Sequence, residues 1–328
     1  MLLLLIQSRR WLLFNIVALK QLNHLRILLI GTSGQLGRAL LDSAPADLEV
    51  IPCNRNDLDL VDVDLCKAFV EFHRPEWVVN AAAFTAVDAA EKDPHLAHVV
   101  NCASPAAFAA ELAKNGGRML QISTDFVFNG QQGHPYQPDD SVEPLGAYGI
   151  SKAAGEFQVQ NILGDRAHVL RTSWLYGPVG SNFLLTMLRL HQLKAAAGES
   201  LAVVADQVGC PTSTLGLAAA CWRLIQRASQ IQGSGIQEQR LPPILHWSDA
   251  GAASWYDFAL AIGELGVAAG LLQQAAYVKP ITTADYPTPA RRPSYSLLDC
   301  SGSSAALEIE QQHWREALKA VIAVLASA

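Results

Sequence analysis

The stretch LRILLIGTSGQLGRALLDSA at residues 25–44 decides the fold of this chain. Its first part, LRILLI at 25–30, is short, rich in leucine and isoleucine, and followed directly by a glycine, a pattern typical of a buried parallel strand. The glycine-rich turn GTSGQLG at 31–37 follows, and RALLDSA at 38–44 has a helical pattern. Together they predict the first strand–turn–helix unit of a parallel sheet.

Strands and helices keep alternating after this unit. The connections are short, which predicts right-handed crossovers and a doubly wound parallel sheet of the α/β class. The predicted strands lie at 48–54, 76–83 and 118–124, and a strand running into a loop is predicted at 166–177. The predicted helices between them lie at 63–73, 94–116 and 146–162.

The alternation loosens beyond residue 175. Helical patterns at 182–193 and 214–229 are mixed with proline-marked stretches, and the polar segment 230–241 predicts an exposed loop. We therefore expect a Rossmann-like dinucleotide-binding domain and a smaller, interleaved C-terminal substrate domain. The first would take residues 25–170 plus about 214–250, and the second about 171–213 plus 251–328.

Residues 1–24 form an extension of unclear role. Its two apolar runs are interrupted by QSRR at 7–10, and neither reaches the roughly twenty residues that span a membrane. The positive charges follow the first run, whereas a signal peptide carries them before it. A mis-called start, a disordered extension and an interfacial helix all remain open, and no membrane span is predicted.

Charge and cysteine content narrow the functional class. The net charge of −6 and the scattered basic residues argue against a nucleic-acid partner. The spacing of the cysteines shows no CxxC pair and indicates buried free thiols in a reducing cytoplasm. The six cysteines stand at 53, 66, 102, 210, 221 and 300.

The glycines of the first turn predict a dinucleotide site. Gly31, Gly34 and Gly37 are spaced GxxGxxG between a strand and a helix. Glycines at such a junction permit a tight turn and a close approach of the backbone to a pyrophosphate, which the helix N-terminus stabilises. The spacing departs from the usual GxGxxG, so the prediction depends on the position of these glycines between the first strand and the first helix.

The end of the second strand favours NADPH over NADH. Arg55 stands where an NAD-specific fold often places an acid, and its guanidinium can pair with a 2′-phosphate. Two alternatives stay open: Arg55 is simply a solvated surface residue, or Asp57 or Asp59 reaches the ribose, which would permit NADH.

Tyr148 and Lys152 predict a ketone-reducing centre. They lie four residues apart in AYGISK and so share one helical face. Reduction of a ketone leaves an alkoxide that a phenol can protonate, and a nearby ammonium would lower the phenol pKa from its usual value of about 10. YxxxK alone is also found on solvated helix faces. Thr124 strengthens the prediction because it ends a strand at the edge where ligands bind, and its hydroxyl can hydrogen-bond a substrate carbonyl.

The segment NAAAFTAVD at 80–88 ends another strand at the same edge. The small side chains of Ala81, Ala82 and Ala83 would let a nicotinamide lie against the backbone. Three strand ends and one helix face are thus expected to converge on one crevice.

In this order the motifs resemble those of the extended short-chain dehydrogenase/reductases, in particular the branch that reduces nucleotide-linked keto-sugars. The resemblance covers residues 25 to about 300. The matching stretches are LLIGTSGQLG, VVNAAAFTAVDAAE, STDFVFNG, YGISKAAGE, RTSWLYG, NFLLTMLRL, DQVGCPT, WYDFA and YPTPARRP.

The resemblance implies NADPH-dependent reduction of the C4 ketone of dTDP-4-dehydro-6-deoxy-L-mannose to dTDP-L-rhamnose, with Thr124, Tyr148 and Lys152 as the catalytic residues. Phe126 departs from the family, which often carries tyrosine there. The cofactor-binding residues implied are Gly31, Ser33, Gly34, Gln35, Leu36, Gly37, Arg55, Ala81, Ala82, Ala83, Thr85, Tyr148 and Lys152. The substrate-binding residues implied are Thr85, Val87, Thr124, Asp125, Phe126, Trp174, Arg291 and Arg292.

Some family members carry acidic residues for a magnesium-linked dimer. The segment after Gly37 is RALLD, so the sequence does not support Mg²⁺, no metal site is predicted, and a homodimer stays open.

Several other residues receive structural interpretations. His95 and His98 are expected on a surface helix, and Asp88 and Glu91 as favourable charges in a first helical turn. Asp125 has an alternative interpretation, in which it accepts a local backbone hydrogen bond instead of acting in proton transfer. Trp247 and Trp255 are expected to pack the second domain, and Gln207 and Thr212 to form a turn at the domain junction.

Two other functions remain open. The fold and the triad would equally suit another nucleotide-sugar reductase or an epimerase, although WYDFA and YPTPARRP favour the reductase that forms dTDP-L-rhamnose. A similar fold also serves as a non-catalytic regulatory subunit of methionine adenosyltransferase, which an intact Thr–Tyr–Lys set disfavours.

Overall fold

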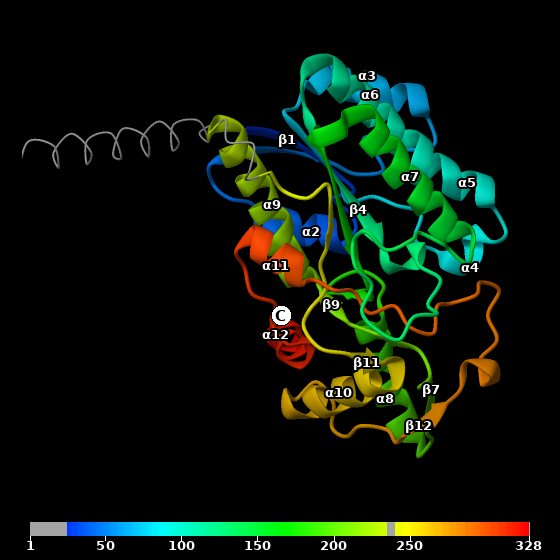
Figure 1. The fold of residues 1–328 in the computed structure, drawn as a ribbon. Helices are drawn as coiled ribbons and strands as arrows, with labels where there is room; N and C mark the ends of the chain where they lie inside the picture. The colour runs from blue at the N-terminus through cyan, green and yellow to red at the C-terminus, as the bar shows by residue number, and fades with distance from the viewer. Residues whose placement is uncertain (1–24, 235–239, 328) are drawn as a thin grey trace, which may run out of the picture.

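The computed structural model describes residues 25–234 and 240–327, so the extension 1–24 lies outside the described residues (Figure 1). A parallel six-stranded sheet with the order β10-β5-β4-β3-β1-β2 forms the centre of its first part. Its strands are β1 (Leu25–Ile30), β2 (Leu48–Cys53), β3 (Trp77–Asn80), β4 (Arg118–Thr124), β5 (Ala167–Thr172) and β10 (Ile244–His246).

The inner strands are buried on both faces, as expected of parallel strands covered by helices. All four residues of β3 and all six of β5 are buried. The strand order reverses at β1, with β2 on one side and β3 on the other. Ligands of open α/β sheets bind at such a reversal, beyond the carboxyl ends of the strands. The predicted α/β class with a parallel sheet is confirmed.

Helices cover both faces of this sheet (Figure 1). One layer holds α3 (Val63–His73), α6 (Ser104–Asn115) and α7 (Ala147–Leu163), and the other holds α2 (Gln35–Asp42), α9 (Thr214–Ser234) and α11 (Ser301–Leu307). Each layer packs its own apolar core against the sheet.

The helix predicted at 94–116 is in fact three pieces. They are α5 (Pro94–His98), a π-helical segment η1 (Val99–Ala103) and α6. The wider turn brings the carbonyl oxygen of Asn101 against α7, where a Cβ built on Gly155 would lie 2.1 Å from that oxygen. A π-turn places a residue out of the α-helical register, and such turns are frequent at functional sites.

A second lobe lies beneath the sheet in Figure 1. Its helices are α8 (Phe183–Ala197), α10 (Trp255–Ala268) and α12 (Trp314–Ser327), and its parallel strand pair is β7 (Leu201–Val204) with β12 (Val278–Ile281). These elements share a separate apolar core. Short strand pairs join the lobe to the end of β5: β6 (Leu175–Tyr176) with β9 (Thr212–Ser213), and β8 (Val208–Gly209) with β11 (Ala253–Ser254).

The strand running into a loop that is predicted at 166–177 is confirmed: β5 ends at Thr172, and Trp174 takes a left-handed backbone conformation with φ 45° before β6 begins. Two other local predictions were wrong. Helix α9 continues to Ser234, five residues into the predicted loop 230–241. Trp247 packs in the core of the first part, because β10 places it beside α9. Leu307, from the range predicted for the substrate domain, packs in that core as well.

Candidate functional site

A cavity of about 780 Å³ lies at the carboxyl ends of β1, β3 and β4. This volume lies in the range typical of sites for small molecules and cofactors. Almost all of the predicted site residues line it, whereas Gly37 and Arg291 do not. The predicted residues in its wall are Gly31, Ser33, Gly34, Gln35, Leu36, Arg55, Ala81, Ala82, Ala83, Thr85, Val87, Thr124, Asp125, Phe126, Tyr148, Lys152, Trp174 and Arg292.

The glycine turn holds the backbone where an anion can approach it. Gly31 has φ 93°, and a Cβ on it would lie 2.7 Å from the backbone nitrogen of Ala82. A Cβ on Gly37 would lie 2.2 Å from the carbonyl oxygen of Gly31, so Gly37 permits close packing of α2 and does not face the cavity. Gly34 precedes α2 without a side-chain cap, and no acid stands in the first turn. The N–H groups at this helix start therefore suit a phosphate.

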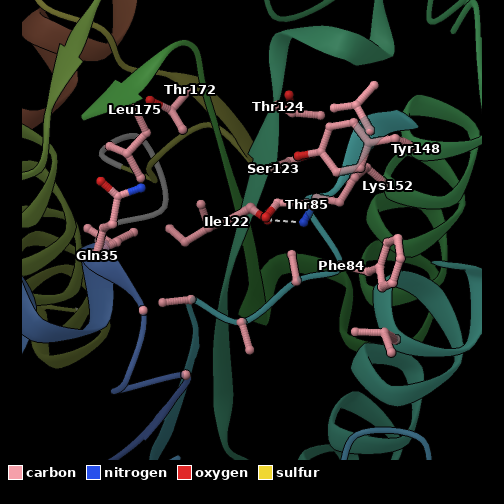
Figure 2. Close-up of a pocket in the computed structure, with 18 of the residues that line it drawn as sticks. Gln35, Phe84, Thr85, Ile122, Ser123, Thr124, Tyr148, Lys152, Thr172 and Leu175 are labelled. Atoms are coloured by element: carbon pink, nitrogen blue, oxygen red, sulfur yellow. Dashed lines mark hydrogen bonds between the residues drawn. The ribbon is translucent and has the colours of Figure 1, made fainter. Parts of the chain in front are cut away.

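Gln35 also connects the two parts of the molecule. Its Oε1 accepts a hydrogen bond of 2.8 Å from Asn182 Nδ2, and its Nε2 donates to the carbonyl oxygen of Ser181 at 3.4 Å. Figure 2 shows Gln35 on the same side of the cavity as Leu175, at the start of the second lobe. The cavity is thus closed on this side by both parts of the chain.

Arg55 lies in the loop after β2, and its guanidinium forms no ion pair with any of the described residues. Arg55 is exposed and lines the cavity. The two acids considered for the ribose are engaged locally: Asp57 Oδ2 accepts from the Asn54 backbone N–H at 2.9 Å, and Asp59 Oδ1 accepts from that of Val61 at 3.1 Å. This arrangement favours the arginine as the group that meets the ribose.

Thr124, Tyr148 and Lys152 converge on one wall of the cavity, as Figure 2 shows. Thr124 ends β4, whereas Tyr148 and Lys152 come from the first turns of α7. All three are buried, with exposed fractions of 8% or less. Gly149 lets α7 approach this closely, because a Cβ there would lie 2.2 Å from the carbonyl oxygen of Phe126.

The expected action of Lys152 on Tyr148 is not found. Lys152 Nζ donates a hydrogen bond of 2.6 Å to the carbonyl oxygen of Ile122, drawn as a dashed line in Figure 2. Burial raises the pKa of Tyr148 to about 12, with the hydroxyl of Thr124 opposing the rise, and burial lowers the pKa of Lys152 to about 8. The prediction that the ammonium lowers the phenol pKa was wrong for this state, because desolvation of the phenol dominates.

Asn101 is a site residue that the sequence analysis missed. Its Oδ1 accepts from the backbone N–H of Phe84 at 2.8 Å, and its Nδ2 donates to the Phe84 carbonyl oxygen at 3.1 Å and to Ser151 Oγ at 3.0 Å. It therefore fixes the loop after β3, which carries the three alanines, to the catalytic helix. An asparagine inside a long apolar helical pattern was the available signal.

Aromatic side chains form the wall nearest the second lobe. Trp174 stacks on Trp255 with ring centroids 3.6 Å apart, and Gly209 lies against the other side of the Trp174 ring. Trp255 packs against the apolar core of the second lobe, as expected, and it also lines the cavity. Its Nε1 donates to Gln207 Oε1 at 3.2 Å, which ties the stack to the DQVGCPT segment.

Phe126 packs its ring edge-on against Tyr148, with ring centroids 5.6 Å apart. It thus supplies an apolar wall beside the phenol, as expected for the aromatic residue of this motif. Asp125, which follows Thr124, is 2% exposed, and burial raises the pKa of its carboxyl group to about 6.

The two arginines of the ARRP segment differ. Arg292 lines the cavity and pairs with Asp88 of α4 (Val87–Ala90), with Nη2 and Oδ2 2.9 Å apart, whereas Arg291 is exposed outside it. Asp88 also accepts from the Ala290 backbone N–H at 3.1 Å, and Glu91 Oε1 accepts from that of Ala147 at 2.8 Å. Asp88 stands in the first turn of α4, as expected, and it also holds a distant segment. The expectation was wrong for Glu91, which follows the last residue of α4 and holds the start of α7.

Residues 25–234 and 240–327 contain no group of three or more His, Cys, Asp or Glu side chains arranged to hold a metal ion. Within the same ranges, no helix is both long and apolar enough to cross a membrane. All six cysteines are buried free thiols, as predicted.

Known proteins resemble this chain over most of its length. A dTDP-4-dehydrorhamnose reductase of Aggregatibacter actinomycetemcomitans is 38% identical over 296 residues, which is 90% of this chain and 97% of that protein. The solved structure of a dTDP-4-dehydrorhamnose reductase from Clostridium acetobutylicum has a TM-score of 0.81 at 36% identity and covers 91% of this chain and 99% of its own.

A dTDP-4-dehydrorhamnose reductase from Bacillus anthracis, solved in complex with NADP, has a TM-score of 0.79 at 30% identity and covers 90% of this chain and 98% of its own. The family model described as RmlD substrate binding domain matches residues 25–327. The family expected from the motifs is confirmed, and this chain belongs to the RmlD substrate-binding-domain family of short-chain dehydrogenase/reductase-like proteins.

Proposed function

We propose that this protein is an NADPH-dependent reductase that converts the C4 ketone of dTDP-4-dehydro-6-deoxy-L-mannose into the alcohol of dTDP-L-rhamnose. The observation that carries the proposal is the meeting of Thr124, Tyr148 and Lys152 in one cavity with the first glycine turn. The names of relatives that match nearly the whole chain support the substrate.

The cavity fits a dinucleotide along its length. The uncapped start of α2 suits the pyrophosphate, Arg55 suits a 2′-phosphate, and the loop of Ala81, Ala82 and Ala83 gives a flat surface for the nicotinamide. NADPH supplies the hydride that adds to the carbonyl carbon. Lys152, buried at the same wall, is placed to hold the ribose next to the nicotinamide, and NADH remains a weaker candidate.

Tyr148 is the proton donor in this proposal. Burial keeps its phenol protonated at neutral pH, so a proton is available for the oxygen that becomes the alcohol. The hydroxyl of Thr124 is placed to hydrogen-bond the same oxygen, and the ring of Phe126 limits access of water to the phenol. Together these side chains stabilise the negative charge that develops on the oxygen.

The remaining wall is assigned to the nucleotide-sugar. Thr85 of the loop after β3 and Val87 at the start of α4 are assigned to the sugar, and the stacked rings of Trp174 and Trp255 form the opposite apolar surface. Arg292 offers a guanidinium for the diphosphate. Arg291 is exposed outside the cavity, so a role for it would need a shift of the ARRP segment.

The test is NADPH oxidation measured with dTDP-, UDP- and GDP-linked 4-keto-sugars. We expect turnover with the dTDP-linked 4-keto-6-deoxy-L-mannose to exceed that with the others. Turnover of only a UDP- or GDP-linked sugar would favour the alternative of another nucleotide-sugar reductase. Inversion of a carbon next to the ketone, by loss and return of its proton and with no NADPH consumed, would favour an epimerase. Absence of all turnover, together with stoichiometric binding to methionine adenosyltransferase, would favour the regulatory alternative.

The proposed setting is the cytoplasm, where a small nucleotide-sugar is the partner and NADPH is available. The buried free thiols support a reducing compartment. A homodimer is part of the proposal, and sedimentation velocity would test it.

A further inference from the structure

Asp125 is a buried carboxyl group directly beside the hydroxyl of Thr124. Its Oδ1 accepts a hydrogen bond from Thr124 Oγ1 at 3.0 Å. Its Oδ2 is buried without a hydrogen bond of good geometry from the described residues, although the Ser296 hydroxyl lies near enough to oppose the rise of the pKa, and no cation among these residues pairs with this carboxyl group. Burial of a carboxylate without a cation is costly, so these surroundings raise the pKa of the carboxyl group, and the neutral acid predominates below about pH 6.

The hydroxyl of Thr124 has one proton to donate and two lone pairs to accept with. One lone pair already accepts from the backbone N–H of Phe126 at 3.2 Å. While the proton is donated to an ionised Asp125, none remains for an oxygen atom in the cavity. A neutral Asp125 can reverse the bond and donate to Thr124 Oγ1 instead, which fills the second lone pair and frees the threonine proton.

We propose that Asp125 is a positioning residue that controls the direction of the Thr124 hydroxyl. The neutral carboxyl group turns the threonine proton toward the substrate carbonyl, and the carboxylate withdraws it. This inference rests on the proposed function, in which Thr124 hydrogen-bonds that carbonyl. Asp125 makes and breaks no bond to the substrate, and the only change is the exchange of one proton with water through the cavity.

The ionisable groups next to Asp125 have pKa values different from that of its carboxyl group. Tyr148 of α7 faces the same hydroxyl, with a pKa raised to about 12, and Lys152 has a pKa lowered to about 8. Ser296 adds a hydroxyl that opposes the rise of the Asp125 pKa to about 6. The neutral form is present below that pKa and is lost as the pH rises through it, so kcat should fall in that range.

The test compares the pH profile of kcat in the wild type and in Asp125→Asn. The amide of asparagine donates at every pH, so the variant should lose the fall near pH 6. The kcat of the wild type should fall by about fivefold to tenfold toward a lower plateau, which corresponds to the free energy of one neutral hydrogen bond. KM for the keto-sugar should change less than kcat. A variant that keeps the same fall would overturn the proposal.

Thr124→Val provides the matched control, because it removes the hydroxyl through which Asp125 is proposed to act. On this background, Asp125→Asn should leave the shape of the pH profile unchanged. If Asp125→Asn alters the profile of Thr124→Val as it does that of the wild type, the carboxyl group acts by another route and the proposal fails.

Infrared spectroscopy gives a readout that needs no turnover. The difference spectrum of wild type minus Asp125→Asn should show a carboxylic C=O band that disappears as the pH rises through about 6. In the spectrum of Thr124→Val minus the double variant, the band should persist to higher pH, because the carboxylate has lost a hydrogen-bond donor. No such band at about pH 5, or the same titration in Thr124→Val, would contradict the proposal. A protein that shows both titrations but reduces no keto-sugar would instead refute the proposed function.

Discussion

Asp88 and Arg292 stand 204 residues apart in the sequence and form an ion pair at the rim of the cavity. The pair joins α4 of the sheet part to the ARRP segment, and Asp88 also accepts a hydrogen bond from the backbone N–H of Ala290. Arg292 lines the cavity while it is held in this way. The acid therefore fixes the position of the guanidinium in the cavity wall.

Asp88→Ala should raise KM for the nucleotide-sugar while leaving KM for NADPH and kcat nearly unchanged. Both side chains are partly exposed, and an ion pair of this kind contributes at most about 1 kcal/mol, so a rise of up to about fivefold is expected. Steady-state kinetics check this, with Glu71→Ala on the exposed side of α3 as the control. A lower KM for the sugar in Asp88→Ala would mean that the pair holds Arg292 away from the substrate.

Tyr148→Phe should lower kcat by about a hundredfold to ten-thousandfold, the usual contribution of a positioned proton donor. The ring still fills the space beside Phe126, so the dissociation constant for NADPH should be retained. Single-turnover kinetics and cofactor fluorescence measure the two quantities. Tyr277→Phe, which removes an exposed phenol, serves as the control. Wild-type turnover in Tyr148→Phe would rule out the phenol as the donor.

Arg55→Ala should raise KM for NADPH far more than KM for NADH. A hydrogen bond to a charged group contributes about 1.5–3 kcal/mol, which corresponds to a change of roughly tenfold or more for NADPH. Arg38→Ala is the matched control, because Arg38 is exposed on α2 outside the cavity lining. An equal effect on both cofactors would show that Arg55 does not meet a 2′-phosphate.

Asn101→Ala should weaken both the fold and the cofactor site. The backbone N–H and carbonyl of Phe84 would lose their partner, at a cost of about 1–3 kcal/mol for a buried polar group. The loop after β3 would then be less well placed, so the dissociation constant for NADPH should rise. Urea unfolding and cofactor titration measure the two effects against Asn161→Ala, an exposed position on α7. A variant that is less stable but binds NADPH normally would limit Asn101 to a structural role.

Asp249→Asn should change how stability depends on pH. Burial raises the pKa of Asp249 to about 7, far above its unfolded value, so the native state holds its proton more tightly than the unfolded chain. Its ionisation therefore costs stability as the pH rises from about 4 to about 7. Each unit of pKa shift corresponds to about 1.4 kcal/mol, so the wild type should lose a few kcal/mol relative to Asp249→Asn over this range.

Urea unfolding at several pH values measures this difference. The comparison isolates Asp249, because other buried groups such as His168 and His246 titrate in both proteins. Asp139→Asn, at an exposed position, should show the wild-type dependence. Parallel curves for the wild type and Asp249→Asn would show that Asp249 is not a protonated buried acid.

The parallel sheet and the grouping of the candidate site residues could be predicted from the amino-acid sequence. An apolar strand that ends at Gly31 can pair and turn in few ways, and the four-residue spacing of Tyr148 and Lys152 places both on one helical face. These are local constraints, because they depend on the period of a strand or helix and on the freedom of glycine. The family motifs added the expected substrate.

The partner of each polar group, in contrast, depends on how the folded chain packs. The π-turn that presents Asn101 to Phe84, the stack of Trp255 on Trp174 and the bond from Lys152 to the Ile122 carbonyl join segments that no local pattern relates. Burial likewise sets the pKa of Tyr148, since desolvation depends on everything packed around the phenol. Such contacts follow from how the two lobes and the helices pack, and packing is a property of the whole chain.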